Sequence, residues 1–188
     1  MLLAFFILSF LLSITVMLFR NRIYTKVATI VFVLLHIGLA IYSWINSSRT
    51  ELVYFTFDAT GVILLTVLSV LTIPTVWHGF IYASGDDEKR FSIYHTALIL
   101  LMTFMSGAYL ANNMTVLWIF VEATTLAVAA LIYHDRTEIA LEATWKYVFI
   151  CSAGIAIAYL GILFLGFIYG REDASNLSFE SLAEIIND

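Results

Sequence analysis

The chain has 188 residues, of which 62% are hydrophobic and 12% are charged, and its net charge at pH 7 is −5. An average soluble domain is roughly 45–50% apolar and about 25% charged. The chain therefore lacks the polar residues that would cover a soluble surface, and intrinsic disorder is excluded for the same reason. Cys151 is the only cysteine, which excludes a disulfide framework and cysteine-based zinc or iron–sulfur centres. No basic patch is present that could hold nucleic acid.

Six apolar segments, each long enough to cross a bilayer, follow one another with short connections. A transmembrane helix needs about 20 apolar residues, and the low content of Pro and Gly favours long, uninterrupted helices. We predict an all-α integral membrane protein, a single membrane domain that forms a bundle of about six transmembrane helices. The predicted spans are Leu2 to Phe19, Val27 to Ile45, Ala59 to Ala83, His95 to Ala111, Met114 to Tyr133 and Ala143 to Tyr169.

Lysine and arginine are distributed unevenly between alternate connections. With the N-terminus outside, the outer connections carry only Arg49 and Arg171, and the inner side carries Arg20, Arg22, Lys26, Lys89, Arg90, Arg136 and Lys146. Because cytoplasmic loops are enriched in these residues, we predict that both termini face the non-cytoplasmic side. In the tail from Gly170 to Asp188, the spacing of the apolar residues predicts one short amphipathic helix on the surface, with Phe179, Leu182, Ile185 and Ile186 on one face.

Glu122 lies near the middle of the fifth predicted span and is the only charged side chain between Arg90 and Asp135. An acid at the bilayer centre costs roughly 2.5–3.5 kcal/mol on insertion scales, and such residues usually mark an ion or proton path. Burial raises the pKa of a carboxyl group and a nearby cation lowers it, so a carboxyl group between these influences can load and release a proton. The alternative is a protonated Glu122 that makes a structural hydrogen bond between helices.

Lys146, at the start of the sixth predicted span, is the second candidate for a proton pathway. At 1.5 Å of rise per residue, its depth differs from that of Glu122 by roughly 10 Å, so we expect coupling through water rather than direct pairing. Glu142 precedes Lys146 by one helical turn and could pair with it. The alternative for Lys146 is an anchor whose amine reaches the membrane interface. Asp58 opens the third span, where a carboxylate can cap the first-turn amides.

Three histidines lie within or beside the spans. His36 is central in the second span, where a histidine is usually hydrogen-bonded inside the bundle, and His78 and His95 lie near the inner face. Two histidines at matched depth on facing helices could bind a haem, which leaves a haem-binding membrane cytochrome as an alternative. We retain Asp58, Glu142, His36 and His78 as possible secondary residues of a proton pathway.

Small residues predict close packing of the fifth and sixth spans. Ala123, Ala127 and Ala130 share one face of the fifth span, and the sixth span offers a matching set in Gly154, Ala158 and Gly161. Nucleotide-binding, serine-hydrolase and zinc-protease motifs are absent. The sequence therefore predicts no catalytic residue, no metal site and no cofactor bound by this chain.

Residues 117–163 combine three features. An acid lies in a W-x-x-x-E context on one span, a short polar loop follows, and A-L-E-A-x-W-K-Y opens the next span. This pattern resembles the antiporter-like membrane subunits of the complex I superfamily. The segments V-E-A-T-T-L and L-E-A-T-W-K-Y are most similar to the hydrogenase-4 component F type, found in energy-converting, membrane-bound hydrogenases. Phe57-Asp58-Ala59 and the turn at Asn112-Asn113 also fit this family.

The resemblance implies that Glu122 matches the proton-pathway glutamate of the family's fifth span, and that Lys146 matches its lysine early in the sixth. It also implies an outside N-terminus, in agreement with the charge count. Full-length members have many more spans, and their pathway continues through lysines and a histidine on later spans. We therefore expect this chain to be either a fragment or one piece of a split subunit that another polypeptide completes.

Together these observations predict a proton-translocating membrane subunit, the N-terminal part of an antiporter-like subunit, in a redox-driven complex. The complex would resemble a membrane-bound hydrogenase or an NADH dehydrogenase-like complex of the prokaryotic cytoplasmic (inner) membrane. The expected partners are the lipid bilayer, other membrane subunits that supply the missing spans, and a hydrogenase or dehydrogenase module that carries the redox cofactors. The main alternative is a non-catalytic membrane scaffold or assembly subunit.

Overall fold

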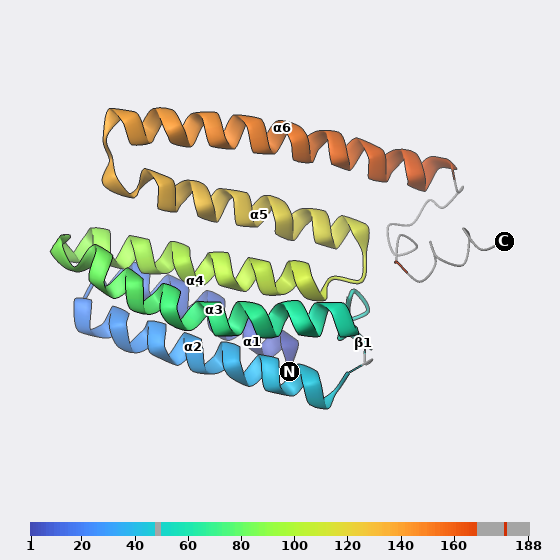
Figure 1. The fold of residues 1–188 in the computed structure, drawn as a ribbon, viewed down its shortest axis with the longest axis horizontal. Coiled ribbons are helices and arrows are strands. Elements are labelled where there is room, and N and C mark those ends of the chain that lie inside the picture. Colours follow the sequence, from blue (N-terminus) through green and yellow to red (C-terminus); the bar gives the residue numbers. More distant parts are fainter. Residues whose placement is uncertain (48–49, 169–178, 180–188) are drawn as a thin grey trace.

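The computed structural model describes residues 1–47, 50–168 and 179, and in this part of the chain six long helices run alongside one another (Figure 1). All six are long and apolar enough to cross a membrane, which confirms the predicted all-α membrane bundle. The helices are α1 (Leu2–Phe19), α2 (Arg22–Ile45), α3 (Ala59–Tyr82), α4 (Glu88–Leu110), α5 (Met114–Ile132) and α6 (Glu138–Ile168). Apart from Phe179, the predicted surface helix of the tail lies outside the described residues, as do Arg49 and Arg171.

Three helices begin earlier than their apolar runs. α2 starts at Arg22, α4 at Glu88 and α6 at Glu138, because backbone hydrogen bonding continues through charged residues that lie at the membrane interface. The side chain of Asn21 caps α2 by accepting hydrogen bonds from the first-turn amides of Ile23 and Tyr24. Hydropathy therefore located the spans, whereas a polar cap marks where α2 starts.

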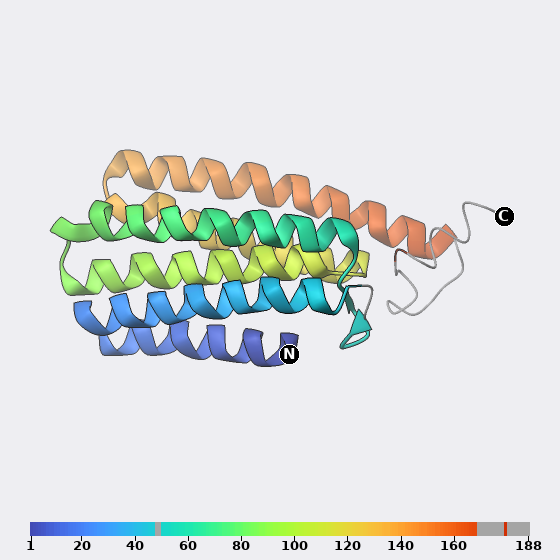
Figure 2. The same cartoon turned by 60° about the horizontal axis from the view of Figure 1, so that its bottom comes forward.

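Helix α4 is the centre of the bundle, since it packs against α1, α2, α3 and α5. α5 and α6 form a hairpin that extends the bundle on one side, with α6 as the outermost helix (Figures 1 and 2). No described side chain of α6 is fully buried. In contrast, more than half of the residues in the apolar stretch of α4 are buried inside the bundle. We call the end with the α1–α2, α3–α4 and α5–α6 connections the basic end.

His36 joins three helices in the interior of the bundle. Its Nδ1 lies 2.8 Å from the Ser69 hydroxyl of α3, and its Nε2 lies 2.8 Å from the Ser106 hydroxyl of α4. The imidazole is fully buried. Hydrogen bonds of this kind hold membrane helices together where the hydrophobic effect offers no preference between lipid and protein. The expectation of a hydrogen-bonded interior histidine is therefore confirmed.

Replacing His36 with Phe should destabilise the bundle, because the aromatic ring keeps most of the volume and loses both interhelical hydrogen bonds. We expect a loss of roughly 1–2 kcal/mol in the free energy of unfolding, measured by steric trapping or thermal unfolding in detergent. His78→Phe is the matched control, since His78 is exposed. Equal stability of the two variants would contradict a joining role for His36.

A short β-hairpin between α2 and α3 ties helices together at the end opposite the basic end. It pairs β1 (Thr50–Glu51) with β2 (Phe55–Thr56) in antiparallel register. Glu51 accepts hydrogen bonds from the Leu2 amide at 3.0 Å and from the Tyr42 hydroxyl at 2.7 Å, so it joins α1 to α2. The Tyr54 carbonyl accepts a hydrogen bond from the Asn112 amide at 2.7 Å, which attaches the hairpin to the α4–α5 turn.

The ionised carboxylate of Glu51 is the favoured form in this setting. Burial by itself would raise the pKa of Glu51, but hydrogen bonds from Leu2 and Tyr42 and the charge of the N-terminal ammonium outweigh it, so the pKa lies below its ordinary value of 4.5. A lowered pKa in the folded state means that the ionised carboxylate stabilises the fold above pH 4.5, and that this stabilisation is lost as the pH falls through the lower folded pKa.

We therefore expect the thermal stability of the chain to fall on acidification below pH 4.5, and this part of the decline to be absent in Glu51→Gln. Glutamine keeps the hydrogen-bond acceptor but has no charge to lose. Melting curves in detergent across this pH range provide the measurement, with the exposed Glu138→Gln as control. Parallel pH profiles for the wild type and Glu51→Gln would show that Glu51 contributes nothing to acid sensitivity.

Candidate functional site between α5 and α6

Glu122 lies midway along α5 and its carboxyl group faces α6. Oε1 accepts a hydrogen bond of 2.9 Å from the Ser152 hydroxyl. Oε2 is buried and has no hydrogen-bond partner in the part of the chain that the structure describes. The carboxyl group therefore makes one interhelical hydrogen bond and keeps one oxygen unpaired, whereas a buried polar group usually has its partners. Sequence reasoning did not find Ser152, although it is the only hydroxyl besides Tyr147 and Tyr159 in the charge-free run 147–168.

The W-x-x-x-E spacing explains how α5 presents this carboxyl group. Residues four apart lie on the same helical face, so Trp118 and Glu122 both face α6. The indole nitrogen of Trp118 donates a hydrogen bond of 2.9 Å to the Ile155 carbonyl, and its ring lies 4.4 Å from that of Tyr159, centroid to centroid. These contacts fix α5 against α6 one turn from Glu122, which holds the carboxyl group beside Ser152.

Lys146 does not approach Glu122. Its amine pairs with the Glu142 carboxylate one turn earlier on α6, and the two side chains are 70% and 65% exposed. At 3.6 residues per turn, Lys146 lies about 120° from Ser152 around the helix. The expected pairing within α6 is therefore present, and the exposed pair lies to one side of the face of α6 that meets α5.

The remaining candidate residues lie in other settings. Asp58 Oδ1 accepts a hydrogen bond of 3.2 Å from the Gly61 amide, so its carboxylate caps α3. His36 makes the hydrogen bonds to Ser69 and Ser106 described above. His78 is exposed and stacks on Tyr82, whereas His95 is buried between Phe80 and Phe91. The structure therefore does not bring His78 and His95 together as a haem would require, and it brings no three or more metal-ligating side chains together among the described residues.

The predicted packing of small residues between α5 and α6 is wrong at Gly154 and Gly161. A Cβ atom built on either glycine meets no atom within 4 Å, so both positions face open space. The alanines of α5 pack against α4 instead, because α6 occupies the opposite face of α5, which carries Trp118 and Glu122.

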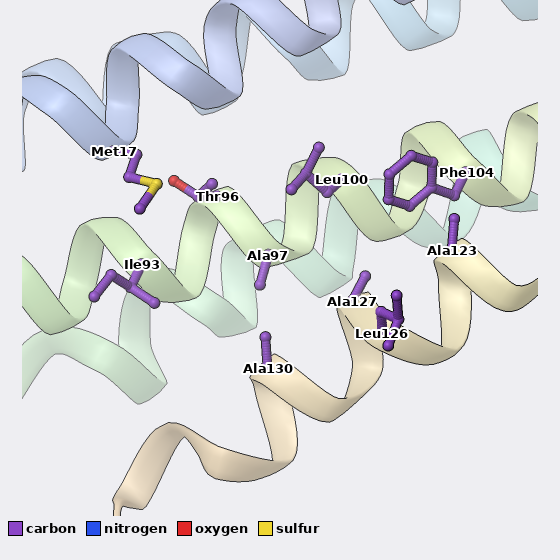
Figure 3. Close-up of a pocket in the computed structure, with 10 residues that line it drawn as sticks. All are labelled: Met17, Ile93, Thr96, Ala97, Leu100, Phe104, Ala123, Leu126, Ala127 and Ala130. Carbon is purple, nitrogen blue, oxygen red and sulfur yellow. The ribbon is translucent and has the colours of Figure 1, made fainter. Parts of the chain in front are cut away.

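The alanine face of α5 lines an apolar pocket of about 350 Å³ between α5, α4 and α1. Figure 3 shows the small side chains of Ala127 and Ala130 directed toward α4. The pocket is lined almost entirely by carbon atoms. It lies on the other face of α5 from the Glu122–Ser152 hydrogen bond, and the two are separate features.

Comparison with known proteins supports the resemblance to antiporter-like membrane subunits. The chain is 27% identical over 124 residues to a hydrogenase-4 component F homolog of Methylacidiphilum infernorum, a match that covers 63% of this chain and 26% of that protein. It is 25% identical over 114 residues to a Na(+)/H(+) antiporter subunit of Bacillus subtilis, covering 61% of this chain and 23% of that protein. An antiporter subunit of Staphylococcus haemolyticus, mnhA2, is 26% identical over 131 residues, with 68% and 16% covered.

No family model matches the chain and no solved structure matches it. The chain spans about a quarter or less of the length of the three relatives. They confirm the predicted similarity to antiporter-like membrane subunits. The six apolar helices and these bacterial relatives identify an integral membrane protein of the prokaryotic cytoplasmic membrane, and they support ion translocation at the level of the family.

Proposed function

We propose that the chain is part of a proton-translocating membrane subunit in which Glu122 takes up and releases protons within a redox-driven complex. Among the residues that the structure describes, Oε2 of Glu122 is buried and has no hydrogen-bond partner, and this observation carries the proposal. Ser152 can donate its hydrogen bond to Oε1 in both states of the carboxyl group, which leaves Oε2 free to hold or lose the proton. The oxygens of a buried carboxyl group with a structural role usually both have partners.

The outer face of α6 supports the proposal that further membrane subunits complete the pathway. Glu142 and Lys146 lie about one and two turns into α6 and remain largely exposed, and exposed charges are costly where they meet lipid. Gly154 and Gly161 face open space on the same helix. Additional transmembrane helices that cover this face would bury the ion pair and pack closely on the glycines. We propose that Lys146 acts through groups on these helices and not by contact with Glu122.

Glu122→Gln should abolish proton translocation and leave the complex assembled. Glutamine still accepts the hydrogen bond from Ser152 and has nearly the same volume, but it cannot take up or release a proton. The measurement is dye-reported proton uptake into vesicles that contain the native complex, with Glu138→Gln as the matched control at an exposed position. Proton uptake at the wild-type rate in Glu122→Gln would overturn the role of Glu122.

A membrane scaffold is the alternative function and gives the opposite pattern. It predicts that Glu122→Gln is silent, whereas Ala127→Leu disrupts assembly because Ala127 is buried against α4. Measuring assembly and proton uptake for both variants therefore separates the two functions.

Gentle solubilisation and purification through a tag on this chain should yield a large assembly. We expect it to contain other membrane subunits, which cover the exposed face of α6, and a hydrogenase or dehydrogenase module. Native mass spectrometry gives its mass and composition. A lone species near 21.2 kDa would contradict the proposed partners and remove the support for a redox-driven pathway through Glu122.

A further inference from the structure

The apolar pocket between α1, α4 and α5 is a groove that opens on the lipid-facing side of the bundle. Met17 and Leu126 border it and are 52% and 56% exposed, so a neighbouring molecule in the membrane can enter. The Thr96 hydroxyl donates a hydrogen bond of 3.5 Å to the Ser13 carbonyl, which leaves a lining of carbon atoms. An empty groove would forfeit the dispersion contacts of its lining. We call this feature the α1–α4–α5 groove and expect an apolar group to fill it in the membrane.

The groove runs along about half the length of a membrane span. Its lining on α4 extends from Ile93, in the second turn, to Phe104 (Figure 3), a rise of about 16 Å at 1.5 Å per residue. The Phe104 ring packs with the rings of Phe10 and Phe120, at centroid distances of 5.8 Å and 6.4 Å, so aromatic side chains gather where the groove ends. Half of a hydrocarbon core of about 30 Å is about 15 Å. The groove therefore has the length of an acyl chain in one leaflet, whereas another transmembrane helix would need a groove along the whole bundle.

Basic side chains lie where the groove reaches the basic end. Lys89 and Arg90 precede Ile93 on α4 by four and three residues, and residues at this spacing share a helical face. Arg20 follows α1, and its Nε donates a hydrogen bond of 3.4 Å to the carbonyl of Met17, which borders the groove. None of these three cations forms an ion pair within the part of the chain that the structure describes. They are therefore available to an anionic group at the end of the groove.

The acidic residues next to these cations in the sequence lie in other settings. Asp86 pairs with His134, with 2.7 Å between Oδ2 and Nε2. Glu88 precedes Ile93 by five residues and lies about 140° from it around α4, away from the groove. Asp87 lies before the first turn of α4, at its N-cap. The groove side of this first turn therefore presents positive charge.

We propose that the α1–α4–α5 groove binds one acyl chain of an anionic phospholipid, whose phosphate group contacts Lys89, Arg90 and Arg20. Lipid and protein interior are equally apolar, so the acyl chain has little preference between the groove and the bilayer. Charge-assisted hydrogen bonds from the ammonium and guanidinium groups to the phosphate then decide which lipid is retained. The bound lipid joins the α5–α6 hairpin to α1 and α4. This inference does not depend on proton translocation.

The first test measures which phospholipid the full chain retains. The chain is held in nanodiscs with equal amounts of phosphatidylglycerol and phosphatidylcholine, and retained lipid is measured by native mass spectrometry. We expect phosphatidylglycerol to predominate, and its ratio to phosphatidylcholine to fall roughly fivefold in each of Lys89→Gln and Arg90→Gln. Arg136→Gln is the matched control, since it removes one charge at the same end from the α5–α6 connection. Equal retention of the two lipids by the wild type, or an equal fall in Arg136→Gln, would overturn the headgroup site.

Ala130→Phe tests whether the acyl chain lies in the groove. Ala130 is exposed and directed toward α4 (Figure 3), so the added ring occupies the groove without entering the core. We expect the variant to lose the retained phosphatidylglycerol. Ala156→Phe is the matched control, because Ala156 is exposed on α6, away from the groove. Phosphatidylglycerol retained at the wild-type level in Ala130→Phe would show that the lipid binds elsewhere.

Photo-crosslinking extends the test to the native complex. Phosphatidylglycerol with a photoactivatable group at the end of its acyl chain should label residues 97–104 of α4 and 123–127 of α5. Labelling confined to other surfaces of the chain would mean that another subunit fills the groove, and would contradict the lipid site. We expect Glu122→Gln to keep the labelling even where proton translocation is lost, because Glu122 faces α6. Failure of this inference and failure of the proposed function are therefore distinguishable.

Discussion

The scarcity of water inside the bilayer is the constraint on which the rest of this structure depends. A polar group in the membrane interior must find its partner within the protein, since lipid offers none. Three residues meet this requirement to different extents. His36 has a serine at each of its nitrogens. Glu122 has a partner at one oxygen only, and His95 has a partner at one nitrogen only, among the residues that the structure describes. The fully paired residue holds the bundle together, and Glu122 is where proton chemistry is proposed.

The two faces of α5 contact different helices of the bundle. The alanine face is directed toward α4, where Ala127 is buried, and it attaches the hairpin to the four-helix core. The opposite face carries Trp118 and Glu122 and holds α6 through the indole and carboxyl hydrogen bonds. Helix α6 is thus attached by a few directed contacts, and its outer face, with the Glu142–Lys146 pair, is left for other helices.

Several features were predictable from the sequence because they depend on local spacing or on a single unusual residue. Apolar runs of sufficient length located the six spans, and the position of Asp58 before such a run indicated a helix cap. Glu122 was conspicuous as an isolated charge, and the four-residue interval between Glu142 and Lys146 indicated their pairing. The resemblance carried by residues 117–163 agrees with relatives that share about a quarter of their residues with this chain over the matched segments.

The partners across helices were decided by the tertiary structure alone. The sequence did not indicate that Ser152 would meet Glu122, that His36 would lie between Ser69 and Ser106, or that Gly79 would face His95. It indicated the wrong neighbour for the glycines of α6. The physical reason is that lipid and protein interior are equally apolar, so a membrane helix can be apolar on every side and its pattern does not reveal which face is buried. Local spacing determines which side chains share a face, and only the packed bundle determines what that face meets.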